Sequence, residues 1–343
     1  MRKSIQSFLK YSLSLGIAVA LFWYLYKDID FTEMLVRFQL VELKWIYLSI
    51  AMSFLSHWVR AYRWNLLLEP LGYNLKTGRT FLAVMVGYLM NFVIPRAGEV
   101  SRCGILNKTD NVPVSQAFGS VVTERIIDAI CLLTVIILTL SLEFDRLSEF
   151  FLNLLSQKTE GIEADYTILF IVVSLLIIGL VGFILIKRNQ SWLMKNPFIS
   201  KLALFLRQLV EGILSIRKLR KKTEFVLSTL LIWVLYFFMT YVVVFSLTET
   251  SQLSITAGFT LLVLGGIGMA TPVQGGIGAF HFLVSAGLVL YGIPENDGIF
   301  FAFLLHTTNS IAIMLLGLIS FFISMVIPKR EAQVTDGNTA QNT

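Results

Sequence analysis

Charged residues are scarce in this sequence: Asp, Glu, Lys and Arg make up 15% of its 343 residues, while 56% are hydrophobic. A soluble domain carries about 25% charged residues. The chain also has only two cysteines, without CxxC or Cys/His spacing, and three histidines that stand singly. These shortages exclude an ordinary cytosolic globule, a disordered chain, a disulfide-stapled secreted domain and a zinc site. We therefore expect no metal and no cofactor.

Motifs of soluble catalysis are absent as well. The sequence contains no GxxxxGK(S/T), HExxH, GxSxG or GxGxxG pattern, and no carboxylate pair on a soluble loop. We therefore name no catalytic residue and expect no nucleic-acid partner.

What the sequence does contain is a series of apolar runs that approach the roughly 20 residues needed to cross a bilayer. Six of them predict spanning helices: residues 9–26, 45–67, 115–142, 166–186, 225–247 and 298–327. No small-x-small cleavage site follows the first run, so we expect an uncleaved anchor. Residues 1–328 should form one polytopic membrane domain, followed by a short disordered cytoplasmic tail at 329–343.

Basic residues set the expected orientation. Segment 187–222 holds ten basic residues and one acidic residue, which favours a cytoplasmic location for this segment as an amphipathic surface helix. Segment 143–165 holds six acidic and two basic residues, and we place it outside. The basic N-terminus and C-terminal tail are both expected on the cytoplasmic side.

This orientation requires two further apolar stretches to enter the membrane and return to the same side. Residues 80–113 would dip in from the cytoplasm and turn at Pro95 and Gly98. Residues 254–292 would dip in from outside and turn at Pro272. The expected fold class is an all-α integral membrane protein, with six spanning helices plus two oppositely entering re-entrant helical hairpins. Such opposed, broken segments are typical of an inverted repeat with its site near the midplane.

The first candidate site lies at the first turn and contains Asn91, Arg96, Glu99 and Arg102. Pro95 is favoured at the first position of a helix, which predicts that a helix restarts there. Arg96, Glu99 and Arg102 would then share one face. A helix N-terminus with two arginines suits a phosphate. Alternatively, the arginines extend to the cytoplasmic interface and Glu99 merely pairs with them.

The second candidate site is Glu124, Arg125 and Asp128. Only fourteen uncharged residues follow in this helix, about 21 Å of helix against a hydrocarbon core of about 30 Å. The three side chains should therefore face inward and pair with one another or with the first site. They are either part of a binding site or a structural ion-pair network.

The third candidate site is the second turn, with Gln274, Gly275, Gly276, Gly278 and His281. Free amides of such a turn form an anion nest, and a helix should begin at Gly278. The alternative is close helix packing through small residues, including the preceding run Gly265-Gly266-Ile267-Gly268. His281 is either a proton-dependent group or donor to substrate, or a packing residue.

Two other polar pairs are less specific. Arg60 and Arg63 lie among aromatic residues at a cytoplasmic helix end, and interfacial anchoring explains them adequately. His306 and Asn309 either line the same cavity or form hydrogen bonds between helices.

Three motifs in this order resemble the lysylphosphatidylglycerol synthase transmembrane region family, also called flippase-like domain proteins. They are Asn91-Phe92-Val93-Ile94-Pro95-Arg96-Ala97-Gly98-Glu99-Val100-Ser101-Arg102, then Glu124-Arg125-x-x-Asp128, then Pro272-x-x-Gly275-Gly276-Ile277-Gly278. The resemblance extends over about residues 10–327. It implies a bacterial inner-membrane protein related to the flippase module of the multiple peptide resistance factor, which moves aminoacylated phospholipid between leaflets.

The chain departs from the family pattern at two places. The family commonly has proline at the position of Gln274 and glutamate at that of His281, which weakens the case for a substrate with a cationic group there. The sequence ends soon after Arg330, so we expect no soluble aminoacyl transferase domain.

We therefore expect a lipid translocase whose partner is a membrane phospholipid or an isoprenoid-phosphate lipid. One alternative is a membrane enzyme or accessory factor acting on lipid-linked sugars or aminoacyl lipids, with Glu124 or Asp128 as base. Another is a membrane scaffold that transports nothing. A homo-oligomer and a separate lipid-modifying enzyme are further partners left open.

Overall fold

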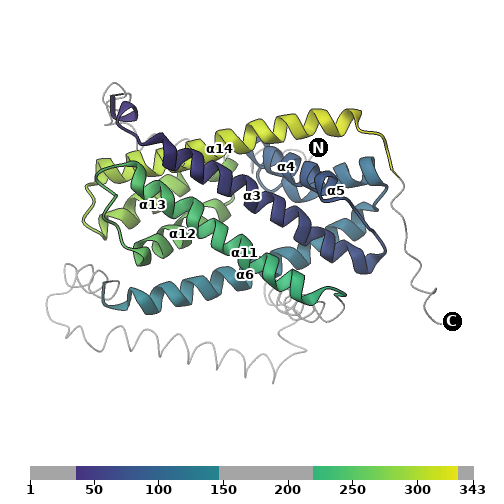
Figure 1. Cartoon of the computed structure of the whole chain (residues 1–343), viewed down its shortest axis with the longest axis horizontal. Helices are drawn as coiled ribbons and strands as arrows, with labels where there is room; N and C mark the ends of the chain where they lie inside the picture. Colours follow the sequence, from purple (N-terminus) through teal and green to yellow (C-terminus); the bar gives the residue numbers. More distant parts are fainter. Residues whose placement is uncertain (1–35, 147–218, 331–343) are drawn as a thin grey trace, which may run out of the picture.

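The structure is a computed structural model that describes residues 36–146 and 219–330. Within these residues the chain is helical and contains no β-strand (Figure 1). The α-helices are α3 (Leu43–Leu68), α4 (Thr77–Val93), α5 (Gly98–Asp110), α6 (Val114–Leu142), α11 (Lys222–Tyr241), α12 (Ile255–Ala270), α13 (Ala279–Val289) and α14 (Glu295–Val326). Three short 3₁₀ helices, η1 (Glu69–Leu71), η3 (Val242–Ser246) and η4 (Gln274–Gly276), lie between them.

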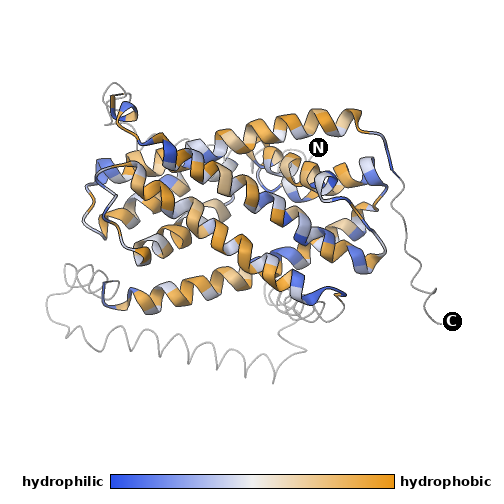
Figure 2. Cartoon of the chain, in the orientation of Figure 1, coloured by the Kyte–Doolittle hydropathy of each residue, from blue (hydrophilic) through white to orange (hydrophobic). Residues whose placement is uncertain are grey.

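Three of the described helices are long and apolar enough to cross a membrane: Val114–Leu142, Lys222–Ser246 and Glu295–Val326. Their outward faces are apolar, as the colouring of α6 and α14 shows in Figure 2. Ile137 and Phe322, for example, are 65% and 66% exposed. Large apolar side chains displayed in such numbers require a non-aqueous surrounding.

Four of the six predicted runs coincide with helices of the structure. They correspond to α3, α6, α11 with η3, and α14. The runs 9–26 and 166–186 lie outside the described residues, as do most of segment 187–222 and the tail from residue 331.

The two interrupted stretches form helical hairpins, the first made of α4 and α5 and the second of α12 and α13. In the first, a Cβ added at Gly87 would lie 2.8 Å from the carbonyl oxygen of Gly98. In the second, a Cβ at Gly268 would lie 2.6 Å from Cα of Phe280. Both contacts are backbone to backbone, so only glycine permits such an approach of the paired helices.

The first hairpin turns differently from the prediction. The helix restarts at Gly98 and not at Pro95, because Arg96 adopts a left-handed backbone conformation with φ 62°. That conformation interrupts a right-handed helix. The amide of Gly98 donates instead to Oδ1 of Asn91, 2.8 Å away at the end of α4.

Two apolar clusters hold the described helices together. One gathers Phe301 of α14, Leu261 of α12 and Val284 of α13, and the other gathers Trp64 of α3 and Leu106 of α5. All five side chains are fully buried. The second cluster surrounds the polar groups described next.

Candidate functional site

Six charged side chains from three helices meet in a buried group, which we call the arginine cluster. Its members are Arg60 and Arg63 of α3, Arg102 of α5, and Glu124, Arg125 and Asp128 of α6. Three of its members belong to α6, a helix long and apolar enough to cross a membrane, and the side chains of Arg60, Arg63, Arg102 and Glu124 are at most 5% exposed.

Glu124 is the centre of this cluster, and its side chain is 0% exposed. Its Oε1 accepts hydrogen bonds from Nε of Arg60 at 2.7 Å and from Nη2 of Arg125 at 2.8 Å. Its Oε2 accepts from Nη1 of Arg102 at 3.1 Å. Both oxygens of Glu124 are therefore engaged by guanidinium groups.

Asp128 lies one turn further along the same face of α6. Its Oδ2 accepts from Nη2 of Arg60 at 2.5 Å, and its Oδ1 accepts from Nη2 of Arg63 at 2.6 Å. Arg125 forms a weaker ion pair with it, at 3.4 Å. The expected pairing of Glu124, Arg125 and Asp128 with one another and with the first site is confirmed in this geometry.

The interpretation of Arg60 and Arg63 as interfacial anchors is wrong. The two residues are only 4% and 0% exposed, because they point into the protein toward α6. A sequence feature that could have indicated this is a polar stripe along α3, all of it buried: Ser49, Ser53, Ser56, His57, Arg60 and Arg63. Polar residues at this spacing in an apolar helix avoid lipid by facing the protein interior.

Aromatic and hydroxyl groups complete the surroundings of the arginines. The Nη1 of Arg60 donates to the Tyr236 hydroxyl of α11 at 2.7 Å. The guanidinium of Arg102 lies over the Trp64 ring, 4.6 Å from its centroid. Both contacts suit a cation that has left water.

The cluster has unused hydrogen-bonding capacity. Nε of Arg63 and Nη2 of Arg102 are buried and have no hydrogen-bond partner among the described residues. Oε2 of Glu99, one turn before Arg102 on α5, is also buried and has no hydrogen-bond partner among the described residues. Arg125 is the accessible member, with 42% of its side chain exposed.

Arg96 lies apart from Arg102, contrary to the predicted common face. It is exposed on the turn between α4 and α5, and its Nη2 donates to the carbonyl oxygen of Ala270 at 3.4 Å. The separation follows from the helix start at Gly98, which leaves Arg96 outside the helix. Arg96 therefore contacts the second hairpin, while Arg102 contacts the arginine cluster.

The second turn contains three glycines with positive φ: Gly275 at 56°, Gly276 at 75° and Gly278 at 83°. The amides of Gly276 and Ile277 donate to backbone oxygens of the same turn, and that of Gly278 donates to Nδ1 of His281 at 3.2 Å. These three amides therefore do not form the expected open anion nest. The helix start at Gly278 is confirmed, since Gly278 is the N-cap of α13.

The two histidines of this region hold the second turn. Nε2 of His306 lies 2.8 Å from the carbonyl oxygen of Gly275, and the His281 and His306 rings are 4.7 Å apart. His306 thus joins α14 to the turn by a hydrogen bond. Asn309 bonds back to Leu305 and lies 3.5 Å from Oγ of Ser49.

The turns of the two hairpins meet. A Cβ added at Gly275 would lie 2.5 Å from the ring of Phe92, at the end of α4. The Arg96 contact to Ala270 joins the same two regions. The third candidate site therefore lies against the first, and the first is connected through Arg102 to the second.

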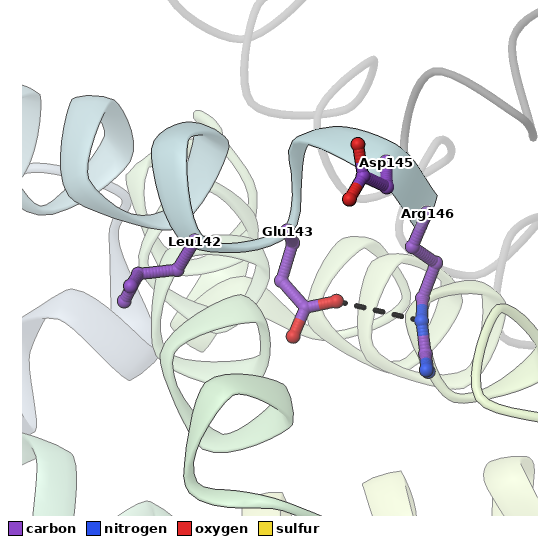
Figure 3. A pocket seen from close by; sticks show the side chains of 4 residues that line it. All are labelled: Leu142, Glu143, Asp145 and Arg146. Atoms are coloured by element: carbon purple, nitrogen blue, oxygen red, sulfur yellow. Dashed lines mark ion pairs between the residues drawn. The ribbon is translucent and has the colours of Figure 1, made fainter.

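A pocket of about 410 Å³ lies at the C-terminal end of α6, lined by Leu142, Glu143, Asp145 and Arg146 (Figure 3). Arg146 pairs with Glu143 at 3.4 Å and lies over the Tyr291 ring. From Asp128 to Leu142 the helix rises about 21 Å, at about 1.5 Å per residue. The pocket is therefore separate from the arginine cluster.

Comparisons with known proteins agree with the motifs. The family described as the lysylphosphatidylglycerol synthase TM region matches residues 11–317. The UPF0104 membrane protein MJ1595 of Methanocaldococcus jannaschii is 22% identical over 313 residues, which cover 86% of this chain and 88% of that protein. No solved structure matches the chain. The family match includes all three candidate sites and confirms the resemblance, so this multi-pass membrane protein belongs to the lysylphosphatidylglycerol synthase TM region family.

Proposed function

We propose that the chain is a lipid translocase of the flippase type. It moves a phospholipid or lipid-linked phosphate headgroup between leaflets along a polar path near the membrane midplane, while the acyl chains stay in lipid. In this proposal six helices span the membrane, the two hairpins re-enter it from opposite sides, and both termini are cytoplasmic. The membrane is the bacterial inner membrane.

The observation that carries the proposal is the arginine cluster. An ionisable residue at the centre of a membrane helix costs about 2.5–3.5 kcal/mol on insertion scales, so such residues are rare where they serve no function. Here four arginines contact Glu124, which is fully buried. Contact with a polar headgroup that passes this position explains why charged side chains are buried here.

The meeting of the two hairpin turns supports the same proposal. Broken helices in two halves of a transporter commonly place their turns around the substrate near the midplane. Phe92 and Gly275 bring the two turns into contact, and Arg96 adds a cation at that place. The family match supports a membrane lipid as the substrate.

The proposed substrate contacts fall into two groups. Around the first turn and the cluster they are Asn91, Arg96, Glu99, Arg102, Glu124, Arg125 and Asp128, and around the second turn Gln274, Gly275, Gly276, Gly278 and His281. Arg102 binds the phosphate at the cluster, and Arg96 contacts the headgroup where the two hairpin turns meet. Glu124 and Asp128 balance and orient the arginines, because their oxygens already accept from guanidinium groups.

The same geometry argues against Glu124 or Asp128 as the base of a lipid-modifying enzyme. A general base must lie within hydrogen-bond reach of the proton that it removes, and the Glu124 side chain is 0% exposed. Guanidinium donors occupy both oxygens of each carboxylate. The enzyme alternative therefore has less support than the translocase.

The proposal is tested with the full chain reconstituted in vesicles that contain a headgroup-labelled fluorescent lipid. A membrane-impermeant reductant removes fluorescence from the outer leaflet only, so a translocase exposes the remaining half. We expect faster loss than in protein-free vesicles for at least one phospholipid or isoprenoid phosphate. Arg102→Gln should slow the transfer, whereas Lys44→Gln should not, because the Lys44 side chain is 69% exposed and distant from the site in sequence.

Three outcomes contradict the proposal. Rates equal to those of protein-free vesicles for every lipid tested exclude translocation. Full function in cells of Arg96→Ala, Glu99→Ala and Arg102→Ala proteins that accumulate normally favours the scaffold. A changed lipid species in a deletion strain, detected by mass spectrometry, favours the enzyme.

A further inference from the structure

Two histidines hold the second turn through opposite hydrogen-bond roles. The amide of Gly278 donates to Nδ1 of His281 at 3.2 Å, so this ring nitrogen carries a lone pair. The carbonyl oxygen of Gly275 has no proton to donate, so Nε2 of His306, 2.8 Å away, is the donor in that contact. His281 is therefore the acceptor at this turn, and His306 is the donor.

A proton affects these two contacts differently, because both nitrogens of a protonated imidazole are donors. His306 keeps its hydrogen bond to Gly275 in either state, since its Nε2 already donates. His281 loses its hydrogen bond to Gly278, since the new N–H at Nδ1 points at the amide N–H. The closed turn therefore accepts the neutral form of His281 and excludes the protonated form.

No acid of the surrounding helices lies close enough to balance a charge on His281, which is 2% exposed. α12 and α13 contain no acidic residue. On α14 the acids are Glu295 and Asp297, and Asp297 precedes His306 by nine residues, about 14 Å of helix. α4, which contacts the turn through Phe92, has no acidic residue either.

The other ionisable groups around the turn oppose a second positive charge. The ring of His306 lies 4.7 Å from that of His281, and Arg96 contacts Ala270 at the end of α12. The ionisable side chains of α4 are Arg79 and Tyr88. A buried charge without a partner is costly because it has lost its hydration, so a protonated His281 requires water and hence an open turn.

We propose that His281 is a proton-binding site and that uptake of the proton opens the second turn. Gly275 and Gly278, with φ of 56° and 83°, supply backbone that can change conformation there. The consequence for transport rests on the proposed function. Because Gly275 lies against Phe92, opening separates the two hairpin turns where the headgroup passes.

The size of the effect follows from proton linkage. An imidazole in water has a pKa of about 6.5, and the closed turn binds no proton at His281. The ratio of open to closed turn should therefore be constant above about pH 7.5 and rise about tenfold for each pH unit well below about 6.5. Between pH 8 and pH 5 the expected increase is about thirtyfold.

Hydrogen exchange of the purified full chain in detergent, read by mass spectrometry, tests the proposal. Protection of residues 275–282, corrected for the intrinsic exchange rate at each pH, should fall about thirtyfold from pH 8 to pH 5. Peptides from α11 serve as the internal reference, and their protection should change less. Protection at the turn that does not depend on pH overturns the proposal, as does an equal fall in α11.

Two variants assign the proton. His281→Asn places an amide oxygen near the position of Nδ1 and does not titrate, so the fall in protection at the turn should disappear. His306→Gln can still donate to Gly275 and does not titrate either, so the fall should persist. A fall that survives in His281→Asn overturns the assignment. If His281→Asn does not accumulate, His306→Gln decides, because loss of the fall there assigns the proton to His306.

The vesicle assay separates this inference from the proposed function. Lipid transfer by a protein whose second turn does not respond to pH overturns the inference and leaves the translocase intact. A turn that opens in acid, in a protein that transfers no lipid, does the reverse.

Discussion

Nη1 of Arg102 lies 3.1 Å from Oε2 of Glu124, and this contact joins the first helical hairpin to the buried charges of α6. Arg102 is on α5, one turn after the hairpin begins its return at Gly98. A shift of the hairpin therefore changes the number of donors that Glu124 receives. This coupling gives the turn region a direct physical connection to the arginine cluster.

Glu124→Ala should strongly destabilise the protein. It leaves Arg60, Arg102 and Arg125 without their shared acceptor, and loss of one partner from a buried ion pair costs about 3–5 kcal/mol. Thermal unfolding of the detergent-solubilised protein measures the loss. Glu42→Ala is the control, because the Glu42 side chain is 56% exposed and its ion pair with Lys44 is exposed to solvent, so no measurable change is expected. Equal melting temperatures for the two variants would contradict a central role of Glu124.

Arg63→Met and Asp128→Leu should be less harmful together than the sum of their separate effects. Each single change leaves a buried charge with fewer partners, since Nη2 of Arg63 and Oδ1 of Asp128 are 2.6 Å apart. The double change removes both members of the pair, and we expect a coupling of about 1–3 kcal/mol. A double-mutant cycle of unfolding free energies measures it. Additive effects would show that the contact makes no energetic contribution.

Gly98→Ala should loosen the packing of α4 on α5. An added Cβ would overlap the carbonyl oxygen of Gly87, and such overpacking costs about 1–3 kcal/mol. Gly104→Ala, on the same helix, meets no atom within 4 Å and should stabilise by about 0.5–1 kcal/mol through helix propensity. The two unfolding free energies should therefore change in opposite directions. A stable Gly98→Ala protein would show that the close approach is unnecessary.

Gly275→Ala should impair both stability and lipid transfer. Its φ of 56° is unfavourable for alanine, and the added methyl would also meet the Phe92 ring at 2.5 Å. Gly292→Ala is the matched control, because its φ is 77° but no atom lies within 4 Å. The control should lose only the backbone contribution of about 1–2 kcal/mol. Adding Phe92→Ala to Gly275→Ala should restore part of the stability that Gly275→Ala loses beyond the Gly292→Ala control. Equal losses of stability in the two glycine variants would exclude a contribution from the contact between residue 275 and Phe92.

His306→Phe should destabilise the second turn. The substitution keeps a ring of similar shape but removes the partner of the Gly275 carbonyl oxygen, 2.8 Å away. A buried acceptor left unsatisfied costs about 1–3 kcal/mol. Hydrogen exchange at the turn amides should increase relative to α11, which packs against α3 and α12. Unchanged exchange at residues 275–278 would show that the hydrogen bond does not hold the turn.

Local features of this protein could be predicted from its sequence because they depend on neighbouring residues. Apolar runs of sufficient length predict α6, α11 and α14, and the prolines and glycines predict both helix breaks. The order of three short motifs indicates the family. The start of α5 was predicted three residues early, because the left-handed conformation of Arg96 depends on how the turn is packed.

By itself, then, the sequence determined that the chain is a multi-pass membrane protein of this family, with two interrupted helices and buried acids on α6. Only the tertiary structure decided which cations those acids meet. Arg60 and Arg63 precede Glu124 by about 60 residues, and their ion pairs arise because packing places α3 against α6. The same holds for Phe92 and Gly275, which are distant in sequence and adjacent in space. Helix formation follows from local periodicity, whereas the pairing of distant charges follows from the way the helices pack.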